Sequence, residues 1–101
     1  MDQPFYVYMV QCKNGAIYTG IALNVQNRIN QHNNKKGSKS VIAHGLPVKL
    51  LCQIKQKNKS QALKLESKIK KLTRNQKLEL IKQRILLCQL RIVLKKQINS
   101  Y

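Results

Sequence analysis

The stretch FYVYMVQCKNGAIYTGI, residues 5–21, decides the fold of this 101-residue chain. Two runs rich in aromatic and β-favouring side chains flank Lys13, Asn14 and Gly15, which are typical turn residues. The pattern predicts a β-hairpin. Its turn has either two residues, Asn14 and Gly15, or three, with Lys13 included and Gly15 in the left-handed conformation.

The length of this turn decides which side chains share a face of the hairpin. A two-residue turn places Tyr8 and Tyr18 on opposite faces. A three-residue turn pairs Tyr8 with Gly20 and Val10 with Tyr18, so that both phenols lie on one face. We favour the three-residue turn, in which the two phenols are diagonal neighbours with Cβ atoms roughly 7 Å apart. Both hydroxyls can then reach one phosphate.

Apolar periodicity and capping residues predict the elements after the hairpin. In order, they are a helix over residues 25–33 capped by Asn24, a mobile polar loop over residues 34–45, a strand over residues 48–54, a helix that Ser60 caps and that runs to residue 72, and a helix from about Arg74. The predicted order is therefore β-β-α-β-α-α. We expect an α+β fold, with a small antiparallel three-stranded sheet flanked by helices.

Each predicted element has an apolar face. In the third strand the face carries Val48, Leu50 and Cys52. The buried stripe of the second helix carries Ala62, Leu65, Ile69 and Leu72, and that of the third helix carries Leu78, Ile81, Ile85, Cys88 and Ile92. Beyond residue 84, apolar side chains exceed what one helix face can bury. We therefore assign residues 1–84 to one domain and residues 85–101 to a helical extension that contacts a protein partner, a second copy or the core.

The charge balance points to a polyanionic partner. The chain has 20 Lys and Arg residues against three acidic ones, a formal net charge of +17, and fourteen of the basic residues lie in residues 51–101. Such an excess repels itself unless a polyanion takes up the charge. DNA is the expected partner, with RNA as the other candidate.

The acidic residues limit the metal chemistry. They are Asp2, Glu66 and Glu79, too few for the carboxylate set that holds paired divalent ions in two-metal nucleases. At most one carboxylate-bound ion is expected. Cys12, Cys52 and Cys88 form no C-x-x-C pair, which excludes a structural zinc site and a disulfide framework. Without a secretory signal or a membrane-spanning run, we expect a cytoplasmic protein.

Polar side chains gather on the inward side of two predicted helices. At 100° per residue, Arg28 and His32 share the face of their helix that carries Val25 and Ile29. Glu66 falls inside the apolar arc of the next helix. An ion pair with Lys70, one helical turn later, is the alternative role for Glu66.

These residue types suit the hydrolysis of a phosphodiester. Glu66 can anchor one Mg²⁺ or Mn²⁺, which keeps several waters and binds a substrate oxygen. The fork-shaped Arg28 guanidinium suits the phosphoryl oxygens. Either Tyr8 or Tyr18 can accept the proton of water if cations stabilise the phenolate. His32 can relay a proton.

The ordered set Tyr6-Val7-Tyr8, Tyr18-Thr19-Gly20, Arg28, His32 and Glu66 resembles the GIY-YIG nuclease superfamily. The match covers residues 5–83 and is most similar to small, stand-alone bacterial members. The resemblance implies that Tyr8, Tyr18 and Arg28 are catalytic and that Glu66 binds the metal. The sequence departs from the pattern at Tyr6, Thr19 and Ile21, and the late Asn of the family has no single equivalent.

The sequence thus favours a metal-dependent endonuclease that hydrolyses DNA, with a structure-directed role in repair or recombination. The alternatives are a non-catalytic nucleic-acid-binding protein on the same fold and a basic RNA-binding assembly protein. The side chains expected to contact nucleic acid are Tyr6, Lys35, Lys36, Lys39, Lys70, Lys71 and Lys77.

Overall fold

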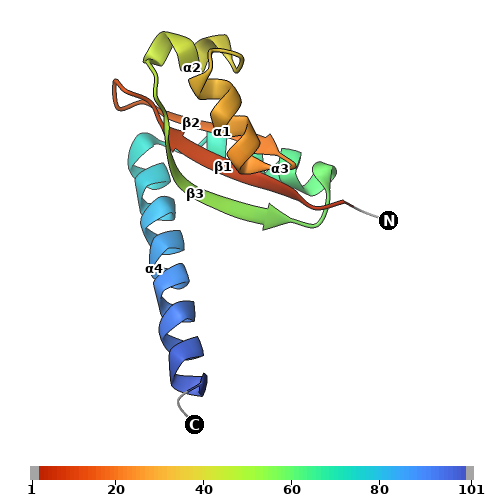
Figure 1. The fold of residues 1–101 in the computed structure, drawn as a ribbon, viewed down its shortest axis with the longest axis vertical. Helices are drawn as coiled ribbons and strands as arrows, with labels where there is room; N and C mark the ends of the chain where they lie inside the picture. The colour runs from red at the N-terminus through yellow and green to blue at the C-terminus, as the bar shows by residue number, and fades with distance from the viewer. Residues whose placement is uncertain (1–2, 100–101) are drawn as a thin grey trace.

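The computed structural model describes the backbone of residues 3–99 and the side chains of residues 3–90. Its elements are β1 (Phe5–Gln11), β2 (Ile17–Ala22), α1 (Val25–Asn33), α2 (Lys39–His44), β3 (Lys49–Gln56), α3 (Lys59–Lys70) and α4 (Arg74–Asn99). The three strands form one antiparallel sheet in the order β2-β1-β3. The predicted α+β class and the three-stranded antiparallel sheet are therefore confirmed (Figure 1).

The hairpin has the three-residue turn that we favoured. Tyr8 pairs with Gly20 and Val10 pairs with Tyr18. Gly15 has φ +92°, the left-handed conformation that glycine adopts at no steric cost. Its amide donates to the carbonyl of Cys12, at 2.9 Å, which closes the turn. This three-residue turn fixes the register of both tyrosines.

The tip of the hairpin is bonded to two other parts of the chain. The amide of Lys13 donates to the carbonyl of Gly45, at 3.1 Å, just after α2. On the other side, Nη1 of Arg74, the first residue of α4, donates to the carbonyl of Gly15 at 3.0 Å. The loop between the first two strands is therefore held from both sides.

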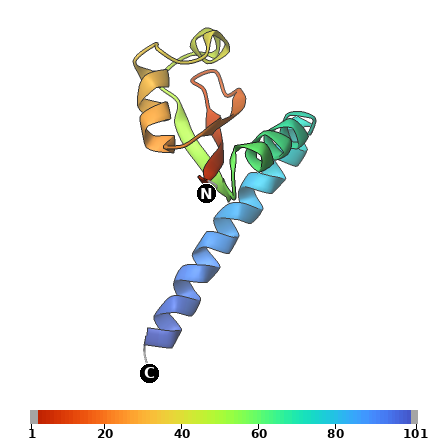
Figure 2. The ribbon, with the colours of Figure 1, turned by 90° about the vertical axis from the view of Figure 1, so that its right-hand side faces the viewer.

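Helices cover both faces of the sheet, with α1 on one face and α3 on the other (Figure 2). The side chains of β1 alternate between two core clusters, because successive residues of a strand point to opposite faces. Tyr8 and Val10 belong to the cluster that includes Val25 and Ile29 of α1. Val7 and Met9 belong to the other, which includes Ala62 and Ile69 of α3 and Ile81 of α4.

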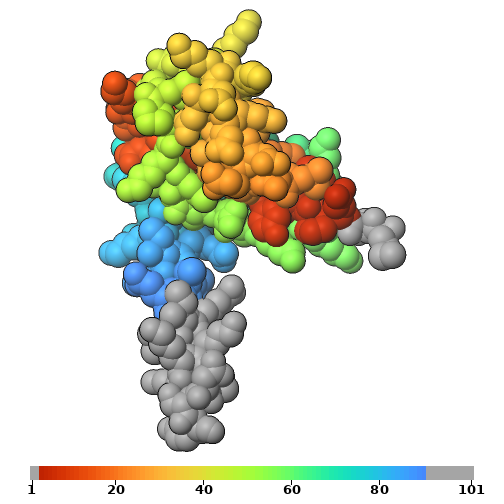
Figure 3. Space-filling model, in the orientation of Figure 1, coloured from red at the N-terminus to blue at the C-terminus, as the bar shows by residue number. Residues whose placement is uncertain are grey.

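The predicted loop over residues 34–45 contains a helix, α2, so this part of the prediction is wrong. Ser38 caps α2, since its Oγ accepts from the amide of Ser40 at 3.2 Å. Val41 is fully buried in the core cluster beneath α1, and burial of a valine side chain contributes about 1.5–3 kcal/mol. Six residues are too few to show helical periodicity in a sequence. Side chains of α1 and α2 together cover much of this face (Figure 3).

A β-bulge changes the faces of β3. Met9 pairs with Cys52 whereas Val10 pairs with Leu50, so one extra residue lies between them. Val48 consequently belongs to the cluster on the α1 side, whereas Cys52 packs on the α3 side. The prediction that Val48, Leu50 and Cys52 share one face is wrong, because strict alternation does not continue through a bulge.

The second predicted helix begins two residues earlier than predicted. The N-cap of α3 is Asn58, whose Oδ1 accepts from the amide of Gln61 at 2.9 Å, and Ser60 is already inside the helix. Asparagine and serine are equally good N-caps, so the sequence offered both. The predicted stripe is correct: Ala62 and Ile69 are buried, and Leu65 and Leu72 are half-buried.

The last helix, α4, extends away from the sheet (Figures 1 and 2). Of its predicted buried stripe, Ile81 is buried, whereas Leu78, Ile85 and Cys88 are exposed. Ile92 lies outside the described side chains. Among the described side chains, Ile81 and the half-buried Leu80 join α4 to the core, and Arg84, Ile85 and Cys88 line an open cavity of about 420 Å³ beside β3. Across residues 3–99, no helix has both the length and the apolar character to cross a membrane.

Candidate functional site

Tyr8 is buried at the centre of the sheet, with 1% of its surface exposed. Its hydroxyl and Nε2 of His32 share a buried hydrogen bond of 2.9 Å. Gly20, the pairing partner on β2, makes room for the phenol: a Cβ at position 20 would lie 2.6 Å from the hydroxyl oxygen. The hairpin register and the absence of a side chain at position 20 thus place Tyr8 against α1.

Three rings gather on this face of the sheet. The Tyr18 ring lies edge-on to the His32 ring, with centroids 5.6 Å apart and an interplanar angle of 73°. The Tyr8 ring is 6.4 Å from Tyr18 and 6.0 Å from His32. These separations fall in the range where aromatic pairs attract each other. Tyr18 is half-buried, so it is the phenol of the cluster that solvent reaches.

His32 comes from the last turn of α1 and is completely buried. Burial lowers the pKa of its imidazole, and the positive charge of Arg28 lowers it further. The ring is therefore neutral at pH 7, with one nitrogen that donates and one that accepts. Nδ1 has no hydrogen-bond partner among the described residues, which leaves the bond to Tyr8 as the contact that fixes the ring.

Arg28 lies one helical turn before His32 and is half-buried. Its Nη1 donates to Oε1 of Gln31 at 2.9 Å. Arg28 also acts on Tyr8. Burial raises the pKa of the Tyr8 phenol, the nearby Arg28 guanidinium opposes this, and the nearby Tyr18 and Glu66 add to the increase. The net pKa lies above 10, so Tyr8 remains protonated at neutral pH.

Glu66 approaches the cluster from α3, on the other face of the sheet. Its side chain is 18% exposed, and its negative charge adds to the rise in the pKa of the Tyr8 phenol, less than burial and Tyr18 do. Oε1 of Glu66 lies 3.7 Å from Nζ of Lys70, whose side chain is 52% exposed. Of the two roles weighed for Glu66 from the sequence, the helical ion pair with Lys70 is present, and the metal-ligand role stays a prediction.

The residues present fit a single oxygen-bound ion. No group of three or more His, Cys, Asp and Glu side chains comes together in the part of the chain that is described. A Mg²⁺ or Mn²⁺ ion needs only one or two carboxylates when waters and substrate oxygens complete its shell. Glu66 is a half-buried carboxylate of this kind, with the exposed Lys70 on one of its oxygens.

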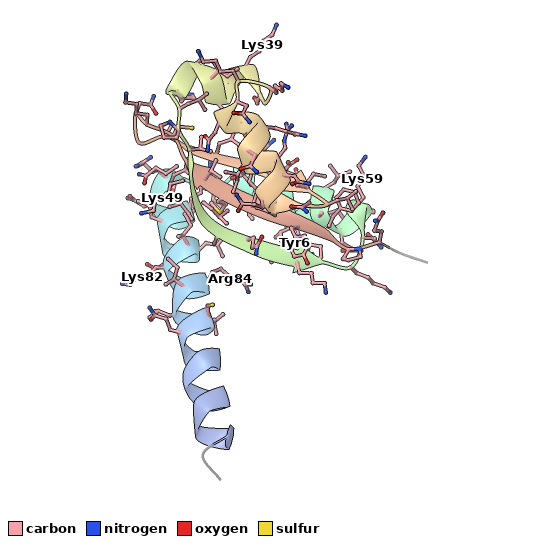
Figure 4. All side chains as sticks on the ribbon, in the orientation of Figure 1. Tyr6, Lys39, Lys49, Lys59, Lys82 and Arg84 are labelled. Carbon is pink, nitrogen blue, oxygen red and sulfur yellow. The ribbon has the colours of Figure 1, made fainter. Side chains whose placement is uncertain are left out.

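The predicted nucleic-acid contacts lie at three places. Lys35, Lys36 and Lys39 are exposed around the start of α2, and Figure 4 shows Lys39 at the outer edge of the molecule. Lys70 and Lys71 are exposed at the end of α3, whereas Lys77 is half-buried on α4. These lysines surround more than one side of the fold and do not form one patch with the aromatic cluster.

Tyr6 is half-buried and packs against the core cluster that contains Tyr8, as Tyr18 does. It lines a cavity of about 350 Å³ together with Gln53 of β3 and the start of α1, including Gln26. Figure 4 shows Tyr6 by the N-terminal end of that helix. Gln26 and Arg28 are two positions apart and point to nearly opposite flanks of α1. Tyr6 borders the same core cluster as Tyr8 and Tyr18, and its contact with nucleic acid stays a prediction.

Two residues at the site escaped the sequence analysis. Gln31 holds the guanidinium of Arg28, and its position three residues later on a helix was a usable signal. Gly37 lies against the His32 ring. No periodic pattern marks Gly37, because a tertiary contact and not its place in an element makes it important.

Comparisons with known proteins agree with this geometry. The family model of the GIY-YIG catalytic domain matches residues 4–79. A UPF0213 protein of Staphylococcus epidermidis is 46% identical over 83 residues, which cover 82% of this chain and 99% of that protein. A UPF0213 protein of Streptococcus agalactiae is 42% identical over 80 residues, covering 79% of this chain and 90% of that protein.

A solved structure shows the same fold. The solution NMR structure of the UPF0213 protein BH0048 from Bacillus halodurans is 33% identical, with a TM-score of 0.53, and the match covers 80% of this chain and 85% of that one. The resemblance that the tyrosine motifs indicated is thereby confirmed. The chain belongs to the GIY-YIG superfamily, as a small member related to the UPF0213 proteins.

Proposed function

We propose that this protein is a metal-dependent endonuclease that hydrolyses DNA phosphodiester bonds. The observation that carries the proposal is the buried Tyr8 to His32 hydrogen bond, with Tyr18 packed against both rings. Membership of a nuclease superfamily supports the reaction type. The net charge of +17 supports a polyanionic substrate, which such a charge attracts from a distance.

Exposure distinguishes the roles of the two phenols. Tyr8 is buried and its hydroxyl is already bonded to His32, so water cannot approach it freely. Tyr18 is half-buried and faces the same cluster. We therefore assign Tyr18 as the general base. Tyr8 positions the Tyr18 ring and the His32 imidazole. A phenol needs nearby positive charge to act as a base at neutral pH, and in this proposal Arg28, which acts on Tyr8 in the same cluster, supplies it.

The reaction is a single displacement at phosphorus. The Tyr18 phenolate accepts a proton from water as the water oxygen attacks. The bond from phosphorus to the leaving ester oxygen breaks, and that oxygen takes up a proton from solvent. Arg28 binds the phosphoryl oxygens on which charge develops. A Mg²⁺ or Mn²⁺ ion held by Glu66 would stabilise the same charge when bound.

Phosphate contacts carry no sequence information by themselves. The groups assigned here, Arg28 and the exposed lysines, act on phosphate. We therefore propose that cleavage is directed by DNA structure, as in repair or recombination in the cytoplasm. The lysines Lys35, Lys36, Lys39, Lys70, Lys71 and Lys77, and the Tyr6 ring, would contact the nucleic acid around the reacting phosphate.

The second candidate is a nucleic-acid-binding protein without turnover, acting on DNA or RNA. One observation favours it: Lys70 lies 3.7 Å from the carboxylate that the metal would need. In this case the charge of the chain serves binding alone. An RNA-binding assembly protein belongs to the same class and would bind RNA more tightly than DNA.

One experiment separates these functions. Purified protein is incubated with branched, nicked and single-stranded DNA and with RNA, with Mn²⁺, Mg²⁺ or a chelator, and compared with Glu66→Gln and Tyr18→Phe. Loss of a general base lowers the rate by about 10²- to 10⁴-fold. We expect metal-dependent cleavage of DNA that both substitutions reduce at least a hundredfold, with binding by fluorescence anisotropy changed less than threefold.

The matched control is Glu79→Gln, which removes the same charge from an exposed position on α4. It should cleave at the wild-type rate. Cleavage that persists in Glu66→Gln and Tyr18→Phe would reject the assigned site. Tight binding without cleavage under any metal condition would establish the second candidate instead.

We also propose that residues 85–101 are a helical extension with a role separate from the catalytic role of the 1–84 domain. The described part of this segment exposes Ile85, Leu86, Leu87 and Leu90, each at 45% or more. Figure 4 shows Lys82 and Arg84 on different sides of the same helix. Such an apolar surface is a candidate for self-association or for a protein partner.

A further inference from the structure

The imidazole of His32 is enclosed on its Nδ1 side. The residue has no exposed surface, and Nε2 is taken by the Tyr8 hydroxyl at 2.9 Å. Nδ1 is buried and has no hydrogen-bond partner among residues 3–90. Something other than a hydrogen bond must therefore hold that edge of the ring.

The backbone of Gly37 provides this support. A Cβ at position 37 would lie 2.8 Å from Cε1 and 2.9 Å from Cγ of His32, and closer still to Nδ1. Real Cβ atoms almost never approach within 3.0 Å of another heavy atom. The φ angle of Gly37 is outside the left-handed region, so its backbone does not demand glycine. The space beside His32 demands it.

The chain on either side of Gly37 is fixed by local hydrogen bonds. The amide of Lys36 donates to the carbonyl of Gln31 at 2.8 Å, and that of Lys35 to the carbonyl of His32 at 3.1 Å. This pair of bonds is the Schellman motif, which ends α1 with Lys35 at φ 62°. After Gly37, Ser38 caps α2. Gly37 is thus held between the end of one helix and the start of the next.

A side-chain contact also ties the end of α1 to β3. Oδ1 of Asn33 accepts from the amide of Val48 at 2.8 Å. Asn33 follows His32 directly, so the residue that carries the ring is anchored to the sheet. The ring therefore has little freedom to move away from Tyr8 or from Gly37.

We propose that Gly37 is a positioning residue, whose backbone presses on the Nδ1 edge of His32 and holds Nε2 against the Tyr8 hydroxyl. Because that edge is closed, His32 exchanges its proton through Tyr8 and not with solvent. The consequence for cleavage rests on the proposed nuclease function, but the placement of the ring does not. Gly37 contacts neither substrate nor reacting atoms in this assignment.

The test compares the wild type with Gly37→Ala. Long-range ¹H–¹⁵N correlation NMR links the ring nitrogens of each histidine to its carbon-bound ring protons and reports the tautomer. His44→Gln distinguishes the signals of the two histidines. In the wild type we expect one fixed tautomer for His32 that does not change from pH 7.5 to pH 5.5. In Gly37→Ala the His32 signals should move and titrate. The kcat for DNA cleavage should fall at least tenfold with KM within twofold.

Ser40→Ala is the matched control, because Ser40 is exposed in the first turn of α2 and contributes only its backbone amide to the cap. It should leave the His32 signals and the kcat unchanged. Unchanged His32 signals in folded Gly37→Ala would overturn the proposal, whatever the cleavage assay shows. A wild type without cleavage would refute the proposed function and leave the NMR result to decide the role of Gly37.

A double-mutant cycle covers the case in which Gly37→Ala does not fold. Two residues in direct contact show coupling in stability, whereas independent ones are additive. With the ring removed in His32→Ala, the added methyl group has space. We expect His32→Ala/Gly37→Ala to melt within 2 °C of His32→Ala. A double variant that melts well below His32→Ala would reject the contact.

Discussion

The Tyr8 hydroxyl and Nε2 of His32, which are 24 positions apart, share a buried hydrogen bond of 2.9 Å. It joins the central strand of the sheet to the last turn of α1. A neutral imidazole and a protonated phenol make such a pair without burying a charge, which would cost far more. The bond therefore supports both the fold and the geometry of the proposed site.

Gly20→Ala should displace Tyr8. The added Cβ would lie 2.6 Å from the phenol oxygen and 2.7 Å from Cζ, and the buried ring has no free space to move into. Overpacking of this kind costs about 1–3 kcal/mol. We expect a lower free energy of unfolding in urea and loss of the proposed cleavage. Gly15→Ala is not a suitable control because of its positive φ. Ala43→Ser on exposed α2 is suitable and should be neutral.

The stability of the protein should fall in mild acid because of His32. Its pKa is lowered in the folded state by burial and by Arg28. As pH falls below the unfolded value of about 6.5, the unfolded chain binds a proton that the folded one excludes. The His32 contribution to stability is thus complete above pH 6.5 and is lost progressively below it. Urea unfolding at pH 7.5 and pH 5 should show this loss, and His32→Gln should show a smaller pH dependence.

Lys35→Gly should stabilise the protein. Lys35 has φ 62° and lies just after α1, at the position that is usually glycine. A residue with a Cβ is strained in this left-handed conformation. Relief of this strain is worth about 1 kcal/mol. We expect a higher Tm by differential scanning calorimetry. Lys36→Gly removes the same charge at the neighbouring position and should give no increase. Equal Tm changes in the two variants would show that charge and not backbone conformation is responsible.

Lys70→Gln should separate the two roles of Glu66. The ion pair is partly solvent-exposed, so its loss should change the unfolding free energy by no more than about 0.5 kcal/mol. If Glu66 binds a metal, removal of the competing ammonium should tighten Mn²⁺ binding in isothermal titration calorimetry. Lys68→Gln on the same helix should leave the affinity unchanged, since residues two apart do not face each other. Weaker Mn²⁺ binding in Lys70→Gln would contradict the role of Lys70 as a competitor.

The exposed leucines of α4 should promote association. Leu87 and Leu90 are 46% and 53% exposed. At an ionic strength that screens the net charge, we expect sedimentation velocity to show concentration-dependent self-association of the wild type. Leu87→Gln/Leu90→Gln should reduce it, whereas Leu23→Gln, exposed at 47% on another part of the fold, should not. A wild type that stays monomeric would leave a different protein as the partner for this surface.

Features governed by neighbours in the sequence were predictable. The turn residues Lys13, Asn14 and Gly15 set the hairpin register, and helical periodicity placed Arg28 and His32 on one face. These patterns express local geometry that tertiary contacts did not override.

Features governed by distant contacts were not predictable. The bulge that separates Val48 from Cys52 depends on how β3 meets β1, and no residue in β3 marks it. The helix α2 exists because Val41 reaches the core beneath α1. Gly37 is important because the chain turns after α1 and brings its backbone against the His32 ring. In each case the deciding partner is known only once the elements pack.

The attachment of the hairpin tip links three separate parts of the sequence. Lys13 bonds to Gly45, the side chain of Asn14 meets that of His44 at 3.0 Å, and Arg74 reaches Gly15. The strands that carry the two phenols cannot fray from their turn without first detaching from residues 30 and 59 positions further along. Opening of the hairpin turn is therefore coupled to its release from the end of α2 and the start of α4, and its amides should exchange with deuterium more slowly than those of an unattached turn.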